Sequence, residues 1–404
     1  MANVSSSNGL EKRPKLRFPG FDEPWKETAL SSVLTERNEY AEKDGTYEHA
    51  TLSKEGIYGK TARYDRDFLV STENKKYKVT HLGDLCYNPA NLKFGVICLN
   101  TYGDAIFSPI YVTFEIDASS DPDFIGAYLT RWDFINRALK YQQGTVYERM
   151  AVSPEDFVSI KCCFPQKAEQ TRLAEFITLL DNRIAAQGKY VESLKKYKRG
   201  VVRTLLSPKH CKLKNVEWTT AKIGDIGTFI KGAPLSKADI SSDGTPFILY
   251  GELYTTYNEV ISKVVRKTQA SVDKQYYSQI GDVIIPTSGE TPEEISTASC
   301  VMLPDIILAG DLNIYRCTQV DGRIMSYILN HVVNDRIARI AQGKSVVHVQ
   351  AAELSKIEIT YPDPFSQKTI IAILAAISDR IDQSNAELRL LHELRKALLQ
   401  KLFI

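Results

Sequence analysis

The sequence has no long apolar run. Of its 404 residues 43% are hydrophobic, yet no stretch approaches the roughly 18 uninterrupted apolar residues that a membrane-spanning helix needs. The first ten residues are polar and lack the charged start and apolar core of a secretory signal, so we expect a cytoplasmic protein. With 25% charged residues and 22 glycines, the composition excludes disordered and fibrous classes and is typical of a globular protein.

Paired cysteines and an excess of one charge are also missing. The seven cysteines are odd in number and scattered, with no C-x-x-C pair, which argues against a disulfide framework and a zinc site. Residues 1–207 carry 29 Lys and Arg against 27 Asp and Glu, and residues 208–404 carry 22 of each, for a formal net charge of +2. This balance excludes a strongly basic protein that coats a polyanion, but it allows DNA contact through one basic face.

Motifs for catalysis are missing as well. Neither G-x-G-x-x-G nor G-x-x-x-x-G-K-[ST] occurs, so no loop is available to cradle phosphates. An adenine methyltransferase would need [N/D]-P-P-[Y/F], and the nearest match, residues 87–90 (YNPA), lacks the second proline and the aromatic residue. We interpret the acidic group at Glu290, Glu293 and Glu294 as a solvated loop. We therefore expect no catalytic residue, no metal and no cofactor in this chain.

What the sequence does contain is an internal duplication. Residues 164–207 align with residues 361–404 without a gap, at an offset of 197. The match continues more loosely upstream, where Gly83-Asp84-Leu85 corresponds to Gly281-Asp282-Val283 and Trp25 to Trp218. Such self-similarity indicates a tandem repeat of a unit just under 200 residues long.

The middles of the two units, about 40–140 and 235–335, share a pattern but few residues. Short apolar or alternating runs bounded by Gly, Pro, Asn and Asp predict strands. Residues 121–140 and 321–343 have apolar side chains at helical spacing and occupy equivalent places. Each middle is therefore predicted to be a mixed α/β domain, and the two middles are predicted to carry different specificities on one scaffold.

The repeated ends predict two long helices. Apolar residues alternate at spacings of four and three through five heptads, interrupted only at Gln187 and Lys198 in the first helix and at the matched Ser384 and Arg395 in the second. This pattern predicts a coiled coil, in which matched polar positions fix register and partner. The predicted seam consists of Leu173, Ile177, Leu180, Ile184, Val191, Leu194, Ile370, Leu374, Ile377, Ile381, Leu388 and Leu391.

Taken in order, these features resemble the specificity subunits of type I restriction-modification systems. The marks are the opening PKLRFPGFDEPW and, in each half, Gln-Gly followed shortly by Thr or Ser, then an apolar segment, an aromatic-Pro pair, a Gln and the long helix. One departure is that the first helix has Asp181-Asn182 where the second has Ser378-Asp379, so the acidic residue shifts by one place.

The resemblance implies an α/β (mixed) fold with two tandem target-recognition domains, joined by two helices that pack antiparallel. It implies a DNA-binding subunit of which each domain reads one half of a bipartite, asymmetric site in double-stranded DNA. The implied partners are two methyltransferase subunits and, through them, restriction-translocation subunits. S-adenosylmethionine, ATP and Mg²⁺ would be held by those partners.

The expected segments are a flexible arm over residues 1–17, recognition domains over 18–163 and 208–360, and spacer helices over 164–207 and 361–404. Candidates for DNA contact are polar residues on loops of the middles and the repeated Gln-Gly segments, because amides, cations and hydroxyls read base edges or hold phosphates. They are Lys60, Arg63, Tyr64, Tyr87, Asn88, Lys93, Tyr102, Gln143, Lys231, Tyr250, Tyr254, Tyr257, Thr287, Ser288, Gln342 and Lys344. Two alternatives stay open at this point, a coiled-coil adaptor that binds only protein and a self-contained DNA modification enzyme.

Overall fold

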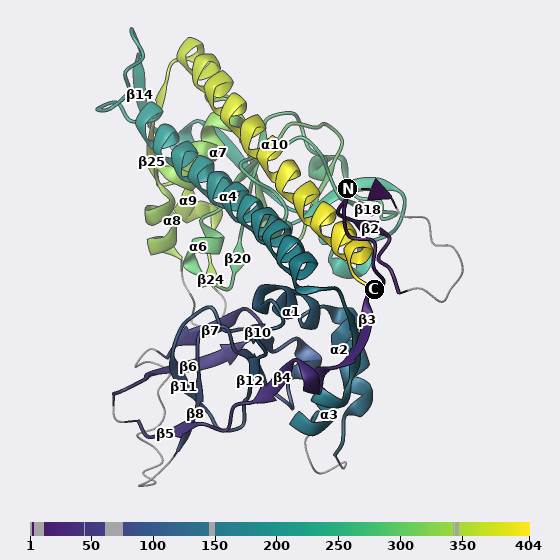
Figure 1. Ribbon diagram of the computed structural model, residues 1–404. Coiled ribbons are helices and arrows are strands. Elements are labelled where there is room, and N and C mark those ends of the chain that lie inside the picture. The colour runs from purple at the N-terminus through teal and green to yellow at the C-terminus, as the bar shows by residue number, and fades with distance from the viewer. Residues whose placement is uncertain are drawn as a thin grey trace. The chain divides into compact units, whose positions relative to one another are not determined.

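A computed structural model describes residues 2–3, 12–43, 45–60, 76–144, 150–341, 343 and 347–404. The chain divides into two compact units, the first comprising Met1–Gln187 with Leu388–Ile404 and the second Gly188–Glu387. Both boundaries fall inside long helices, α4 (Lys167–Leu205) and α10 (Pro364–Leu402) (Figure 1). The predicted mixed α/β fold with two long helices is confirmed.

In its described part, the first unit holds two larger sheets and three short α-helices. A four-stranded antiparallel sheet consists of β10 (Ile97–Leu99), β9 (Leu85–Tyr87), β12 (Val112–Ile116) and β4 (Leu34–Glu36), in that order. A five-stranded sheet has the order β5 (Tyr40–Ala41), β8 (Tyr77–Thr80), β11 (Ala105–Phe107), β6 (Glu48–Ser53) and β7 (Gly56–Gly59). The helices are α1 (Pro122–Leu129), α2 (Trp132–Ala138) and α3 (Pro154–Ser159).

The second unit repeats this plan with additions. Its main sheet has the order β15 (Gly227–Lys231), β23 (Leu312–Cys317), β19 (Asp282–Pro286), β21 (Ser299–Val301) and β17 (Val260–Ile261). A smaller sheet consists of β18 (Arg266–Thr268), β16 (Thr245–Leu249) and β22 (Ile307–Ala309). The helices are α5 (Glu252–Thr255), α6 (Pro292–Ile295), α7 (Gly322–His331), α8 (Asn334–Ile340) and α9 (Ala351–Leu354).

A two-stranded antiparallel ribbon precedes each long helix. In the first unit β3 (Lys26–Ala29) pairs with β13 (Lys161–Phe164), and in the second β14 (Trp218–Lys222) pairs with β25 (Glu358–Pro362). Two further short pairs join β1 (Ala2–Asn3) to β2 (Leu16–Arg17) and β20 (Ser288–Gly289) to β24 (Val347–His348).

The repeat is visible in single hydrogen bonds of the two sheets. Asp84 precedes β9, and its carboxylate accepts hydrogen bonds from the backbone N–H of His81 at 2.8 Å and from Arg37 at 2.9 Å. Asp282 opens β19, and its carboxylate accepts from the backbone N–H three residues earlier, again at 2.8 Å, and from Arg316 at 3.1 Å. The Gly-Asp pairs aligned from the sequence therefore form the same turn.

A repeated glutamine joins each long helix to its neighbouring domain. The buried Gln170 amide donates to the carbonyl of Pro165 at 3.0 Å and accepts from the N–H of Asp121, the cap of α1, at 2.9 Å. Gln367 makes the same two bonds in the second unit, each at 2.8 Å, with the matched proline and with the residue that caps α7. These glutamines satisfy buried backbone groups, which explains their place in the repeat.

The end of the expected N-terminal arm is anchored on α4. Both carboxylate oxygens of Glu169 accept hydrogen bonds from Arg17, each at 2.7 Å, and the two side chains are 5% or less exposed. Residues 4–11 of that arm lie outside the described part of the chain.

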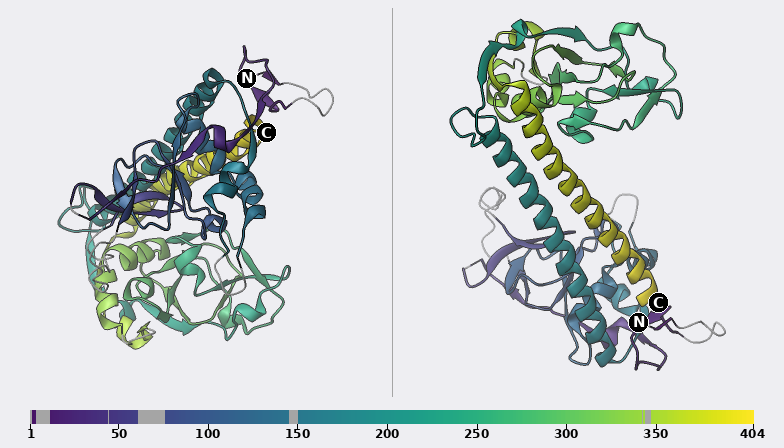
Figure 2. Two further views of the ribbon diagram at one scale, coloured as in Figure 1. Left: turned by 60° about the horizontal axis from the view of Figure 1, so that its bottom comes forward. Right: turned by 90° about the horizontal axis from the view of Figure 1, so that it is seen from above.

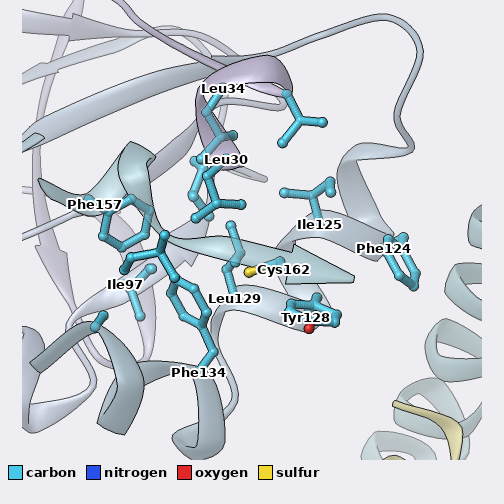
Figure 3. Close-up of a cluster of buried hydrophobic side chains, with 14 of the residues drawn as sticks. Leu30, Leu34, Ile97, Phe124, Ile125, Tyr128, Leu129, Phe134, Phe157 and Cys162 are labelled. Carbon is cyan, nitrogen blue, oxygen red and sulfur yellow. The ribbon is translucent and has the colours of Figure 1, made fainter. Parts of the chain in front are cut away.

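Within the first unit the start of α4 and the end of α10 lie side by side in opposite directions (Figure 2). Leu173 and Ile177 share the main core with Leu402 and Phe403. The Phe403 ring centroid lies within 6.4 Å of those of Trp25, Phe124 and Tyr128. Figure 3 shows part of this cluster, in which α1, α2 and α3 contribute the aromatic side chains.

The second unit has the mirrored arrangement. Val202 and Leu206 from the end of α4 share a core with Ile370 and Leu374 from the start of α10. Each long helix therefore begins in the core of one unit and ends in the core of the other. Among the described helices, none combines the length and the apolar character needed to span a membrane.

Candidate functional site

The second unit carries an open cleft of about 850 Å³ at one end of its main sheet. It is lined by residues 229–235 from β15 and the following loop, Thr287 after β19, residues 310–313 at the start of β23, and residues 348–352. The structure thus brings together Lys231 and Thr287, two residues that the sequence analysis proposed for DNA contact.

Close backbone approach shapes this cleft. A Cβ at Gly232 would lie 2.7 Å from the carbonyl oxygen of Gly310, and one at Gly310 would lie 3.1 Å from the ring of Tyr250. Gly310 also has a φ of +82°, a backbone angle that residues other than glycine rarely adopt. The two glycines therefore let the loop after β15 cross the start of β23.

Cations from three elements surround that loop. Lys231 ends β15, Lys237 lies in the loop, and Arg266 in β18 is 48% exposed. Lys237 and Arg266 line a second cleft of about 640 Å³, which shares Leu235, Gly310 and Asp311 with the first. Arg266 is paired with Glu252, its Nε 3.2 Å from Oε1, so the attraction of this surface for a polyanion rests on Lys231 and Lys237.

An amide that the sequence analysis missed lies in the wall of the first cleft. Asn313 in β23 is 2% exposed, and its Nδ2 has no hydrogen-bond partner among the residues that the structure describes. Its register partner on one side is Lys231 and on the other Ile285. An amide between the buried apolar residues Leu312 and Ile314 is the signal that could have identified it, because a buried unpaired N–H is costly.

The tyrosines proposed for the second domain have intramolecular partners. The Tyr254 hydroxyl donates to the carbonyl of Ser288 at 2.6 Å, and the Tyr257 hydroxyl accepts from the N–H of Val265 at 3.1 Å. Burial raises the pKa of both tyrosines. Ser288 itself is buried and donates to Asp311, so the structure gives its hydroxyl a role inside the domain. Tyr250 remains half-buried beside the second cleft.

In the first unit the structure places Lys60 and Tyr102 near one another. Lys60 follows Gly59, and a Cβ on Gly59 would lie 2.6 Å from a carboxylate oxygen of Glu48 and 2.7 Å from the Tyr102 hydroxyl. A hydrogen bond to Glu48 raises the pKa of Tyr102 to about 12. Arg63 and Tyr64 lie outside the described residues, as do Gln342 and Lys344.

Lys93 and Gln143 are both exposed. Lys93 lies over the ring of Phe94, with its Nζ 5.1 Å from the ring centroid. The Gln143 amide donates to Asp156 at 2.9 Å, and its backbone pairs with Ala151, so it also fixes the end of this loop.

Tyr87 and Asn88 require a correction. Tyr87 is 0% exposed, stacks on Phe157 at 4.6 Å between centroids, and donates its hydroxyl to the carbonyl of Val152 at 3.0 Å. The Asn88 side chain accepts from the N–H groups of the two residues that follow Pro89, which closes the turn after β9. Both side chains hold the first domain together and are not available to bases.

We expect Tyr87→Phe to lower the free energy of unfolding by about 1 to 3 kcal/mol, because the buried Val152 carbonyl loses its partner. The DNA motif methylated by a complex containing this variant should not change. Chemical denaturation and methylation mapping measure the two effects, and a changed motif would return Tyr87 to the candidate readers.

All twelve residues of the predicted seam are buried or half-buried. Those at the helix starts, Leu173, Ile177, Ile370 and Leu374, pack in domain cores as well as against the other helix. The matched polar positions Gln187 and Ser384 are buried too, at 5% and 2% exposure.

This chain is similar to known specificity subunits and specificity domains. The family model for the type I restriction modification DNA specificity domain matches residues 215–392. A curated protein of Methanocaldococcus jannaschii, named as the MjaX type I restriction enzyme specificity subunit, is 23% identical over 293 residues. That match covers 68% of this chain and 66% of the relative, just under two thirds of its length.

Two solved structures have a similar fold. One is the S subunit of a type I restriction-modification system from M. genitalium, with a TM-score of 0.58, 16% identity, and coverage of 97% of this chain and 99% of the other. The second comes from work on complex assembly and conformational transition of a type I system, with a TM-score of 0.59, 16% identity, and coverage of 96% and 99%. These likenesses extend over both units of the chain.

Proposed function

We propose that this chain is a specificity subunit of a type I restriction-modification system and that its two recognition domains each read one half of a bipartite DNA site. The observation that carries the proposal is the repeated sheet, β4-β12-β9-β10 in one unit and β15-β23-β19-β21 in the other, with unlike loops at its ends. One framework presenting two different loop sets suits an asymmetric target.

In the second domain we assign phosphate contact to Lys231 and its neighbours around the cleft. Thr287 and the amide of Gln350 are suited to base edges, since hydroxyls and amides both donate and accept. In the first domain the corresponding candidates are Lys60, Lys93 and Tyr102.

The rest of the proposal concerns partners. The long helices set the spacing of the half-sites and dock two methyltransferase subunits, which in turn bind the restriction-translocation subunits. We assign the chemistry, with S-adenosylmethionine, ATP and Mg²⁺, to those subunits, and this chain contributes only recognition. The assembly would act in the cytoplasm against foreign DNA.

Salt dependence of binding by the complex of this chain with its methyltransferase subunits tests the phosphate contact. Each neutralised phosphate adds about 0.9 to the slope of log affinity against log salt concentration. We expect Lys231→Met to weaken binding at every sequence and to reduce that slope by about one. Lys222→Met is the control, because Lys222 is also exposed but lies in the β14 ribbon.

An unchanged slope for the Lys231 variant would show that Lys231 does not contact a DNA phosphate. Absence of any salt-dependent DNA binding by the wild-type complex would instead favour an adaptor that binds only protein, and would overturn the proposed function.

A further inference from the structure

Three ionisable side chains contact one another where α4 packs against the second recognition domain. Glu259, just before β17, accepts hydrogen bonds on one oxygen from Lys198 Nζ at 2.8 Å and on the other from His331 Nε2 at 2.7 Å. Lys198 belongs to α4, whereas Glu259 and His331 belong to the recognition domain. All three side chains are largely shielded from solvent, with 11% to 16% of each exposed.

The surroundings hold this cluster in place. The backbone carbonyl of Glu259 accepts from Ser326 at 2.6 Å and from the N–H of Cys300 at 2.8 Å. Lys198 Nζ lies 5.3 Å from the ring centroid of Tyr327. Burial alone would raise the pKa of Glu259, but the bonds from His331 and Lys198 outweigh it and lower that pKa to about 2. The carboxylate is therefore ionised and doubly paired at neutral pH.

The residue that corresponds to Lys198 in the other long helix pairs with a carboxylate from a different part of the fold. Arg395, 197 residues after Lys198, pairs in the first unit with Asp181 of α4, with Nη2 2.9 Å from Oδ2. The residue that corresponds to Asp181 is Ser378, which carries no charge. In the first unit the ion pair thus joins the two repeated helices, whereas in the second unit the helix cation takes its carboxylate from the recognition domain.

We propose that Lys198 is a positioning residue that fixes the second recognition domain on α4. A domain that packs on this helix must then supply, at positions 259 and 331, side chains that compensate the charge of Lys198. Exchange of that domain would remove Glu259 and His331 and leave Lys198 behind. A cation that is 89% buried without a counter-ion destabilises its surroundings, so Lys198 limits which domains this helix accepts. Arg395 imposes no such limit, because both members of its pair lie outside the middles.

A double-mutant cycle on the purified complex tests the pairing without any DNA. Glu259→Gln leaves Lys198 uncompensated, and we expect it to lower the melting temperature by roughly 6 °C or more. Adding Lys198→Met, which keeps the apolar stem, should recover much of that loss. Additive effects of the two substitutions would overturn the proposal.

A second readout separates positioning from general stability, and it rests on the proposed function. In methylation maps we expect Lys198→Met to broaden the gap between half-sites or to weaken the second half-site, while the first stays intact. Lys198→Arg should restore the wild-type motif, and Lys195→Met is the control, since Lys195 pairs with the exposed Glu192 of its own helix.

A single, unchanged gap at full rate in Lys198→Met would contradict the proposal. If the wild-type complex methylates no bipartite site, the proposed function fails on its own, and the unfolding cycle still decides whether Lys198 fixes the domain.

Discussion

We expect that exchanging residues 223–357 for the matching segment of another specificity subunit will replace one half of the methylated motif and leave the other half and the gap unchanged. The structure defines these limits, because the N–H of Ile223 donates to the carbonyl of Ile357 at 3.0 Å and so closes the segment on itself. The ribbon of β14 and β25, both long helices and Gln367 remain in place. Residue 198 should be taken from the donor of the segment, for the reason given above.

The matched exchange in the first domain is residues 30–160, which the N–H of Leu30 closes on the carbonyl of Ile160, also at 3.0 Å. It should change only the opposite half-site, and it needs no companion substitution, because Asp181 and Arg395 both lie outside the segment. Methylation mapping of hosts that express each chimera with its partner subunits measures both outcomes. Two half-sites that changed together in either chimera would rule out separate readers.

Lengthening both long helices by four residues should increase the gap between the half-sites by one or two base pairs. Each helix begins in the core of one unit and ends in the core of the other, so only a paired insertion keeps both ends packed. Duplicating residues 184–187 in α4 and 381–384 in α10 adds about 6 Å to each helix, against about 3.4 Å per base pair of DNA. Four residues form a stutter, which a coiled coil absorbs by local unwinding.

The matched control inserts four residues in α4 alone. We expect this variant to lose stability, because α4 no longer agrees in length with α10 and one of the buried ends, Leu206 or Phe403, must leave its core. The decisive measurement is the motif methylated by the paired variant. A wild-type gap at full activity would show that the helices do not set the spacing.

The parts of the fold that could be predicted from the sequence are those fixed by short-range pattern. Heptad spacing indicated α4 and α10 to within a few residues, and the offset of 197 placed Gln170 on Gln367 and Asp84 near Asp282 before their identical hydrogen bonds were known. These features recur because the same backbone groups must be satisfied in both units.

The site was harder to predict because exposure depends on contacts distant in sequence. Tyr87 looked like a loop residue, yet its ring packs on Phe157 and its hydroxyl reaches Val152, 65 residues away. Asn313 looked like part of a core strand, but its amide lies at a cleft built from segments more than 100 residues apart. Composition and periodicity carry no information about such contacts between residues that are distant in sequence.

The place of Phe403 also determines when the first domain can finish folding. Its ring packs on Trp25, Phe124 and Tyr128, and Leu402 beside it is fully buried in the same core. During synthesis, N-terminal domains generally fold as units before the rest of the chain has been made. Here the domain made first must wait with an open aromatic core until residues 402 and 403 have been made, whereas the second domain needs only segments from residue 188 to residue 387. The order of completion is thus the reverse of the order of synthesis, and the unfinished first core is the surface that most needs protection in a newly made chain.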